Sequence, residues 1–174
     1  PINSTIELSI YETNNFLLKL YKNITLIEYT AFYGSIQIFN YLRQNGAELK
    51  SSLWIYAVLG QNPEIINLLE ENKIFPTKDD EISYEQILKE SIKCHHIDVA
   101  NYIQNNYLQN DEEPSNDKLI NGLKYNNFMF IQPNVVNESL FYYLCKYNYY
   151  ILVFILCTNE DININKIFIY FFDF

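Results

Sequence analysis

The sequence predicts an all-α protein built from repeated helix–turn–helix units, and three observations support this prediction. Apolar residues make up 49% of the 174 residues and aromatic residues 17%, more than a disordered chain carries. Four glycines and five prolines are too few for the many turns of an all-β fold. Apolar residues also recur at helical spacing in several separate stretches. We therefore expect helices joined by short turns.

A short pattern repeats in the middle of the chain. The segment Ile38–Leu42 recurs at Ile65–Leu69 and again at Val99–Ile103, at spacings of 27 and 34 residues. Each copy follows an apolar stretch of helical periodicity and a short polar break. The stretches are 26–32, 53–59 and 87–92, and the breaks are Gly34-Ser35, Gly60-Gln61-Asn62 and His95-His96. Each unit is predicted to be a helix, a tight turn and a second helix.

The copy over Thr25–Leu49 resembles the ankyrin repeat. The family's threonine, two leucines and paired small residues correspond to Thr25, Ile27, Tyr29, Thr30 and Ala31, its turn glycine to Gly34, and its second helix and following loop to 36–42 and 46–49. The small residues let two antiparallel helices approach each other. Gly34 and Gly46 tolerate the positive φ that ends a helix. The resemblance implies an ankyrin-repeat solenoid.

Further copies extend this array toward both ends. Residues 156–163 resemble the family's loop ending in Asp, a β-branched residue and Asn, while Ile6–Tyr21 resembles a terminal repeat. Leu119–Ile131 resembles a degenerate repeat with a shortened second helix. We expect an ankyrin-repeat solenoid of about five irregular repeats over 4–165, followed by an apolar cap or a truncated next repeat over 166–174. The approximate repeats are 4–23, 24–50, 51–80, 83–110, 117–133 and 138–165.

Several positions depart from the family's pattern. Trp54 and Tyr56 stand where the family has leucines, and turn spacings run from roughly 21 to 34 residues against the usual 33. We therefore expect irregular stacking, with surface loops at the polar stretches 76–80 and 109–117. The residue after each turn, often histidine in the family, is expected to be Ser35, Asn62, His96, Asn127 or Asn148. The abundance of Asn, Ile and Tyr resembles divergent ankyrin proteins of unicellular eukaryotes.

The charge and cysteine content argue against several classes of partner. Lys and Arg number 12 against 21 Asp and Glu, and the net charge of −9 repels a nucleic-acid backbone. No basic cluster flanks an apolar helix, so membrane attachment is not expected. A membrane span over 140–157 is an alternative, but Lys146, Asn148 and a turn expected near Tyr147 interrupt it. Three cysteines without a CxxC pair predict a reduced, intracellular and cytoplasmic protein.

No constellation of residues predicts catalysis, a metal site or a cofactor, so we expect a protein that is not an enzyme. Cys94 precedes His95 and His96, but adjacent histidines at a turn point apart, and no second cluster completes a metal site. The acidic runs lack the alternating spacing and central glycine of a calcium loop. His96 takes a turn position where the ankyrin pattern often has histidine. We expect it to form hydrogen bonds with neighbouring backbone groups.

The ankyrin resemblance implies a protein partner on the concave face, at two positions near the end of each first helix. By register, the pairs are Phe32 and Tyr33, Leu59 and Gly60, Lys93 and Cys94, Lys124 and Tyr125, and Cys145 and Lys146. The aromatic candidates Phe32, Tyr33 and Tyr125 fit partner anchoring and packing against the next repeat equally well. The lysines predict a basic strip suited to an acidic partner segment. The predicted partner-binding residues are Phe32, Tyr33, Leu59, Lys93, Lys124, Tyr125 and Lys146.

The sequence as a whole predicts a protein-interaction scaffold. An alternative is that the chain is the ankyrin segment of a larger enzyme or membrane protein and serves its regulation or targeting. The apolar run Ile167–Phe174 adds the expectation that copies of the chain self-associate through this end if it is uncovered. A fold of this kind does not identify the partner.

Overall fold

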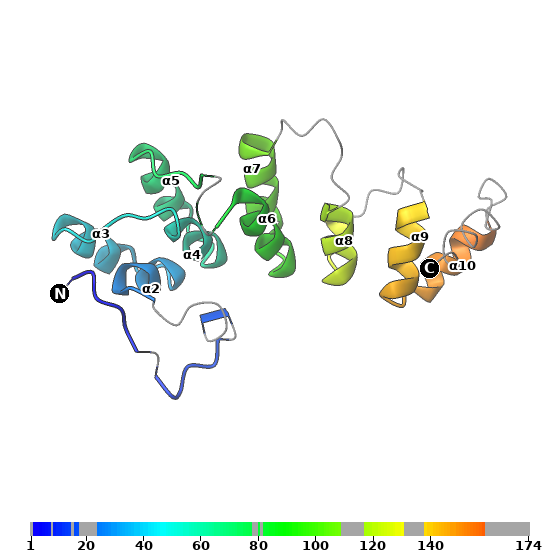
Figure 1. Ribbon diagram of the computed structural model, residues 1–174, viewed down its shortest axis with the longest axis horizontal. Helices are drawn as coiled ribbons and strands as arrows, with labels where there is room; N and C mark the ends of the chain where they lie inside the picture. Colours follow the sequence, from blue (N-terminus) through cyan, green and yellow to red (C-terminus); the bar gives the residue numbers. More distant parts are fainter. Residues whose placement is uncertain are drawn as a thin grey trace. The chain divides into compact units, whose positions relative to one another are not determined.

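A computed structural model of the chain describes residues 2–7, 9–14, 16–17, 24–77, 80, 82–108, 117–130 and 138–158. These residues contain nine α-helices, one short 3-10 helix and no β-strand, which confirms the all-α prediction. The chain divides into two compact units, Pro1–Gln109 and Asn110–Phe174 (Figure 1). Their boundary falls in the acidic stretch 109–117. The expected cap over 166–174 and the loop over 159–163 lie outside the described residues.

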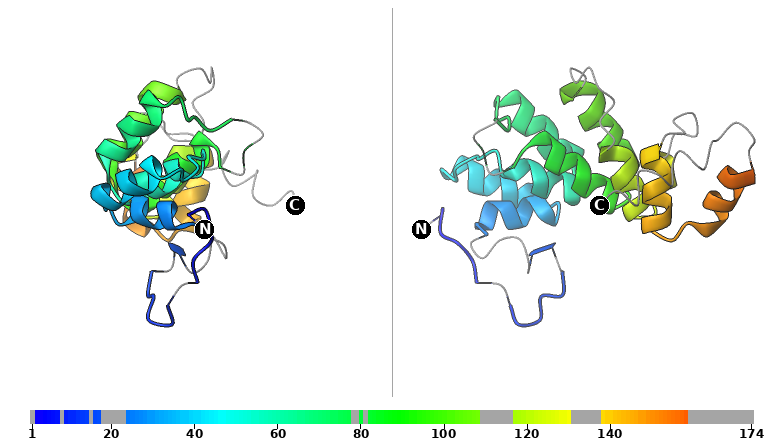
Figure 2. Two further views of the ribbon diagram at one scale, coloured as in Figure 1. Left: turned by 90° about the vertical axis from the view of Figure 1, so that its left-hand side faces the viewer. Right: turned by 45° about the vertical axis from the view of Figure 1, so that its right-hand side comes forward.

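Unit 1 contains three helix–turn–helix pairs in chain order. They are α2 (Leu26–Phe32) with α3 (Ile36–Gln44), α4 (Leu53–Leu59) with α5 (Pro63–Glu71), and α6 (Tyr84–Lys93) with α7 (Ile97–Tyr107). The two helices of each pair pack together, and α4 also contacts both α2 and α6. The three pairs therefore lie side by side, as Figures 1 and 2 show. Their first helices form one continuous layer through unit 1.

Unit 2 contains two further pairs. They are α8 (Asp117–Lys124) with the 3-10 helix η1 (Phe128–Phe130), and α9 (Glu138–Lys146) with α10 (Tyr150–Thr158). The core of this unit joins Leu119 and Leu123 of α8 to Leu140 and Leu144 of α9. The described part of the second element of the α8 pair is the single turn η1, and residues 131–137 lie outside the described residues.

The membrane alternative over 140–157 is wrong for the described residues. The turn between Lys146 and Tyr150 divides this run into α9 and α10, which pack against each other. No helix in the described part of the chain is both long enough and apolar enough to cross a bilayer.

Polar side chains set where several helices begin. The Thr25 hydroxyl accepts a hydrogen bond from the Glu28 N–H, and the Glu28 carboxylate accepts one from the Thr25 N–H, so a complete capping box opens α2. Ser83 and Gln86 form the same arrangement at the start of α6. At the start of α5, the Asn62 side chain accepts a hydrogen bond from a backbone N–H inside the helix. Each such cap stabilises its helix by about 1 kcal/mol.

All five first helices described by the structure end in the same turn. In each turn, one residue with positive φ lies two positions after the last helical residue. These residues are Gly34 (65°), Gln61 (52°), His95 (60°), Asn126 (57°) and Asn148 (62°). The N–H of this residue donates to the carbonyl three positions earlier, and the next N–H donates to the carbonyl five positions before it. This pair of bonds is the Schellman motif, which satisfies carbonyls that a helix end leaves free.

Only part of this turn pattern could be predicted from the sequence. The positive φ expected at Gly34 and Gly46 is confirmed, at 65° and 89°. Gly46 and Lys73 end the second helices α3 and α5 with the same two hydrogen bonds. The side chains of Gln61, His95 and Lys73 disfavour positive φ, so sequence propensity alone does not reveal these turns. The packing of the paired helices holds the backbone there.

Helix α4 is the centre of unit 1, and all seven of its residues are buried. Trp54 and Tyr56, which stand where the ankyrin pattern has leucines, are 0% and 1% exposed. The indole N–H of Trp54 donates to the Ile74 carbonyl at 2.5 Å. Its ring packs edge-on against the rings of Tyr84 and Tyr107, with centroids 5.5 and 5.4 Å away. Trp54 is therefore accommodated by aromatic packing from the third pair, while Tyr56 packs edge-on against Phe16 of the N-terminal segment.

The described residues of the N-terminal segment depart from the terminal repeat expected over Ile6–Tyr21, of which residues 8, 15 and 18–21 lie outside the described residues. Residues 2–7 and 9–14 form turns and one isolated β-bridge, between Thr5 and Thr25, and contain no helix. Helical structure begins at Phe16, because the Asn14 side chain accepts hydrogen bonds from the N–H groups of Phe16 and Leu17. The resemblance to a terminal repeat predicted a helix here, but over 9–14 side chains form hydrogen bonds with the backbone instead.

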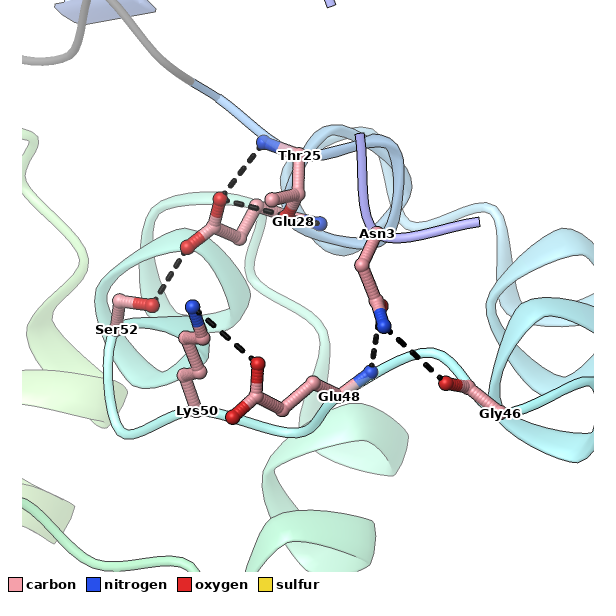
Figure 3. A network of polar contacts seen from close by, with 7 residues as sticks. All are labelled: Asn3, Thr25, Glu28, Gly46, Glu48, Lys50 and Ser52. Carbon is pink, nitrogen blue, oxygen red and sulfur yellow. Dashed lines mark hydrogen bonds and ion pairs between the residues drawn. The ribbon is translucent and has the colours of Figure 1, made fainter. Parts of the chain in front are cut away.

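A polar network ties the N-terminal segment and the first two pairs together (Figure 3). Glu28 is 8% exposed, and its carboxylate accepts hydrogen bonds from the Thr25 hydroxyl at 2.7 Å and the Ser52 hydroxyl at 2.5 Å. Asn3 accepts a bond from the Glu48 N–H at 2.9 Å. The buried carboxylate is thus satisfied by donors from two helix starts, as a buried charge requires.

Candidate partner-binding surface

The predicted partner-binding residues lie at equivalent places in the helix pairs. Five of them are the last residues of α2, α4, α6, α8 and α9, namely Phe32, Leu59, Lys93, Lys124 and Lys146. Tyr33 and Tyr125 are the residues that follow α2 and α8. The structure thus places each of them just before a turn with positive φ.

The pair expected in the last helix pair is displaced by one residue. Asn148 has the positive φ that Gly34 has in the first pair, so the matching positions before it are Lys146 and Tyr147, and Cys145 does not belong to the set. For the same reason Tyr149, and not Asn148, takes the position after the turn. The sequence prediction therefore placed this pair one residue too early.

Leu59 is not a surface residue. Its side chain is 9% exposed and belongs to the fully buried helix α4. Gly60, the other member of that pair, lies where a Cβ atom would come within 2.3 Å of the Phe32 carbonyl oxygen. The end of α4 is therefore pressed against the end of α2. Both positions serve packing between pairs, which corrects the prediction that Leu59 binds a partner.

Phe32 also takes part in packing. Its ring is half-buried and stacks on the Phe16 ring, with centroids 5.9 Å apart and an interplanar angle of 5°. Phe16 in turn packs edge-on against the buried Tyr56. The packing interpretation of Phe32 therefore fits its surroundings better than partner anchoring.

Tyr33 is half-exposed and lies beside Tyr29, one helical turn earlier on α2. Their ring centroids are 4.8 Å apart. The Tyr33 hydroxyl donates to the Glu12 carboxylate at 3.1 Å. Partial burial, with the hydrogen bonds to Tyr29 and Glu12, raises the pKa of Tyr33. Its hydroxyl is therefore a protonated donor at neutral pH.

The three lysines differ in their surroundings. Lys93 forms an ion pair with Glu90, at 2.7 Å, which reduces its contribution to a basic strip. Lys124 and Lys146 are exposed, and no carboxylate among the described residues forms an ion pair with either. The Lys124 ammonium lies 5.3 Å from the Tyr125 ring centroid, and the Lys146 ammonium lies 5.4 Å from that of Tyr142. Such cation–π contacts orient the lysines without neutralising their charge.

The side chains that follow two of these turns link neighbouring pairs, one in each unit. His96 Nδ1 lies 3.2 Å from the Val58 carbonyl oxygen, in the preceding pair. Since a carbonyl can only accept, Nδ1 carries the proton. This confirms the expected backbone hydrogen bond of His96. Burial lowers the pKa of His96 more than its backbone hydrogen bond raises it.

Tyr149 makes the matching link in unit 2, and sequence reasoning missed it. Its hydroxyl donates to the Leu123 carbonyl at 2.7 Å and also lies 2.7 Å from Asn126 Oδ1. Leu123 is three residues before the positive-φ residue Asn126, as Val58 is before Gln61. Its position directly after Asn148 is the sequence feature from which Tyr149 could have been predicted.

The cysteines and acidic residues do not come together as a reactive site in the described part of the chain. Cys94 and Cys145 are exposed, and the desolvation of each thiol by its surroundings raises its pKa, which lowers the thiolate fraction at neutral pH. Among the described residues, no three His, Cys, Asp or Glu side chains are grouped as ligands of one metal ion would be.

Comparison with known proteins identifies no relative. No protein-family model matches the chain, and no curated protein or solved structure matches it either.

Proposed function

We propose that this chain is a divergent ankyrin-repeat array that binds a partner protein through the ends of its first helices. Support for the repeat array comes from the five equivalent Schellman turns and from the two links between pairs, His96 to Val58 and Tyr149 to Leu123. Repeat arrays are stabilised by such contacts between neighbouring units. Within each unit, the first helices of the pairs end in equivalent turns.

The observation that carries the function is the exposure of Lys124 and Lys146 at equivalent ends of α8 and α9. Both are positively charged groups on a protein of net charge −9, and both lie over tyrosine rings. Paired lysines beside aromatic rings suit an acidic partner segment, because the charges attract the partner and the rings add contact area. Binding, and not catalysis, is the proposed role.

Affinity capture with matched charge variants tests this proposal. The full chain is used as bait in a lysate of the native cell, beside Lys124→Glu/Lys146→Glu and the control Lys73→Glu/Lys89→Glu. Lys73 and Lys89 are also exposed, so the control makes the same change in net charge elsewhere. Proteins bound by the wild type and by the control, but lost with Lys124→Glu/Lys146→Glu, are the expected result.

The captured interaction should also weaken as salt rises from 0.05 to 0.5 M, roughly the range over which surface charges become screened. Circular dichroism of all three chains checks that each is folded. Capture of the same proteins by all three chains would reject the surface at the ends of α8 and α9.

A further inference from the structure

Two tyrosines on α2 hold a carboxylate of the chain's own N-terminal segment. Tyr29 and Tyr33 are four residues apart and therefore lie on the same face of the helix. Their hydroxyls both donate to Oε2 of Glu12, at 3.4 and 3.1 Å. The other carboxylate oxygen, Oε1, accepts a hydrogen bond from the Asn14 N–H at 2.8 Å. The tyrosine pair therefore receives one oxygen of a carboxylate that the N-terminal segment presents.

The segment that carries Glu12 has few ties to α2. Within the described residues, the hydrogen bonds between 9–14 and α2 are the two that Glu12 accepts from the tyrosines. The remaining bonds of this segment are local, such as the Glu12 N–H to the Ser9 carbonyl at 2.9 Å. Ile10 and Tyr11, at the tip of this turn, are 91% and 83% exposed. Little apolar surface is buried to hold the turn in place.

We infer that Tyr29 and Tyr33 form a binding site for a carboxylate of an acidic partner segment, and that Glu12 occupies this site within the chain. This inference rests on the proposed function, because Tyr33 is one of the positions at the end of a first helix. The hydroxyls are donors, and a carboxylate accepts from donors more strongly than a neutral group does. Tyr33 is half-exposed, so a partner can reach it when Glu12 withdraws.

Competition with Glu12 sets how tightly such a site binds. A group on the same chain acts at an effective concentration of about millimolar, so a partner's carboxylate must compete with it. The apparent dissociation constant equals the intrinsic one divided by the fraction of molecules in which the site is empty. Removal of the Glu12 carboxylate empties the site and should strengthen binding of an acidic peptide.

A peptide with the sequence of residues 9–14, Ser-Ile-Tyr-Glu-Thr-Asn, is the probe, because this segment is the occupant that the structure shows. It is titrated into the full chain, with ring-labelled tyrosine followed by NMR and the Tyr29 and Tyr33 signals assigned from single Phe variants. The chains compared are wild type, Glu12→Ala and Glu12→Ala/Tyr29→Phe/Tyr33→Phe. The control peptide has Gln in place of Glu and otherwise the same sequence.

The expected result is a saturable shift of both tyrosine signals, with a midpoint at least about threefold lower in Glu12→Ala than in wild type. The triple variant, followed through its remaining tyrosines, and the Gln peptide should show no saturable shift. The inference is overturned by equal midpoints in wild type and Glu12→Ala. It is also overturned by binding that persists without the hydroxyls, or by no binding to Glu12→Ala at up to about 10 mM peptide.

The two proposals fail separately. If Lys124→Glu/Lys146→Glu loses its partner while the peptide result is negative, the scaffold function stands and the Glu12 site is rejected. A positive peptide result without charge-dependent capture would instead support the carboxylate site at Tyr29 and Tyr33 and reject the partner-binding surface at the ends of α8 and α9.

Discussion

The hydroxyl of Tyr149 lies 2.7 Å from the carbonyl oxygen of Leu123 and joins the turn before α10 to the end of α8. His96 and Val58 form the same relationship between the third and second pairs of unit 1. In both cases the side chain directly after a positive-φ residue reaches a carbonyl three residues before the preceding positive-φ residue. Each of these carbonyls already accepts the N–H of the positive-φ residue that closes its own turn. The side chain from the next pair adds a second hydrogen bond to the same oxygen.

Tyr149→Phe should lower the free energy of unfolding by about 1 kcal/mol, because it removes one donor and leaves the Leu123 carbonyl without this hydrogen bond. Urea unfolding followed by circular dichroism measures the change. Tyr150→Phe is the control, since Tyr150 is the next residue and is 71% exposed. An equal loss of stability in the two variants would contradict the role of the Tyr149 hydroxyl.

The stability of the chain should depend on pH through His96. Its pKa is lowered in the folded protein, so between that value and the ordinary 6.5 the unfolded chain binds more protons than the folded one. Stability contributed by neutral His96 is therefore fully present above about pH 6.5 and declines as pH falls through 6.5 toward the lowered pKa. Urea midpoints measured between pH 5 and pH 8, roughly the range over which histidine titrates, should show this decline.

His96→Asn should flatten this part of the pH profile. The matched control is His95→Asn, because His95 is the neighbouring residue, is exposed and has a positive φ of 60° that Asn adopts readily. It should retain the pH dependence of the wild type. The same slope in His96→Asn and wild type would show that another group titrates.

Gly60→Ala should destabilise the chain through a steric clash between pairs. A Cβ atom at this position would come within 2.3 Å of the Phe32 carbonyl oxygen and 2.8 Å of that of Ala31, both of them backbone atoms. We expect a loss of about 2 kcal/mol or more, as for other overpacked sites. Thermal unfolding measures it.

Gly46→Ala separates clash from backbone strain. Gly46 has a φ of 89° and no atom within 4 Å of its added Cβ, so Ala there meets strain alone. We expect about 1 kcal/mol of destabilisation at Gly46, a smaller effect than at Gly60. The reverse order would mean that the ends of α2 and α4 are not in close contact.

Lys73→Gly should stabilise the chain. Lys73 has a φ of 56° at the end of α5, and glycine adopts this conformation at lower cost than a residue with a Cβ atom. The expected gain is up to about 1 kcal/mol, offset in part by the greater freedom of glycine in the unfolded chain. Lys73→Ala removes the same charge but keeps the strain. It should therefore leave the unfolding free energy near that of the wild type.

The sequence was most informative where periodicity and turn chemistry agree. Apolar spacing over 26–32 and 53–59 predicts two helices, and both are observed with these bounds. Gly34 marks the turn between the first two helices, and His96 could be assigned its hydrogen bond from its place in the repeat. These are local properties, since helical spacing and the positive φ of glycine depend little on distant residues.

Other features needed the packed structure because more than one pattern was consistent with the residues. The resemblance over Ile6–Tyr21 predicted a repeat, yet residues 9–14 form a turn in which the Glu12 carboxylate accepts the Asn14 N–H. In the last pair the predicted register was one residue too early, and Tyr149 was therefore overlooked. Aromatic residues are so frequent in this chain that their presence did not separate the packing role of Phe32 from an anchoring role.

The sequence by itself determined that the described part of this protein is helical, the bounds of α2 and α4, and the residues at the ends of four of the five first helices. Periodicity, capping and glycine chemistry act over a few neighbouring residues, which is why they can be read from the chain. Only the tertiary structure decided that Leu59 is buried and that Glu12 lies on Tyr29 and Tyr33. Both features depend on segments distant in the chain, so local spacing does not specify them. The ion pair of Lys93 with Glu90 is different, because the i,i+3 spacing on one helix already places the two side chains side by side.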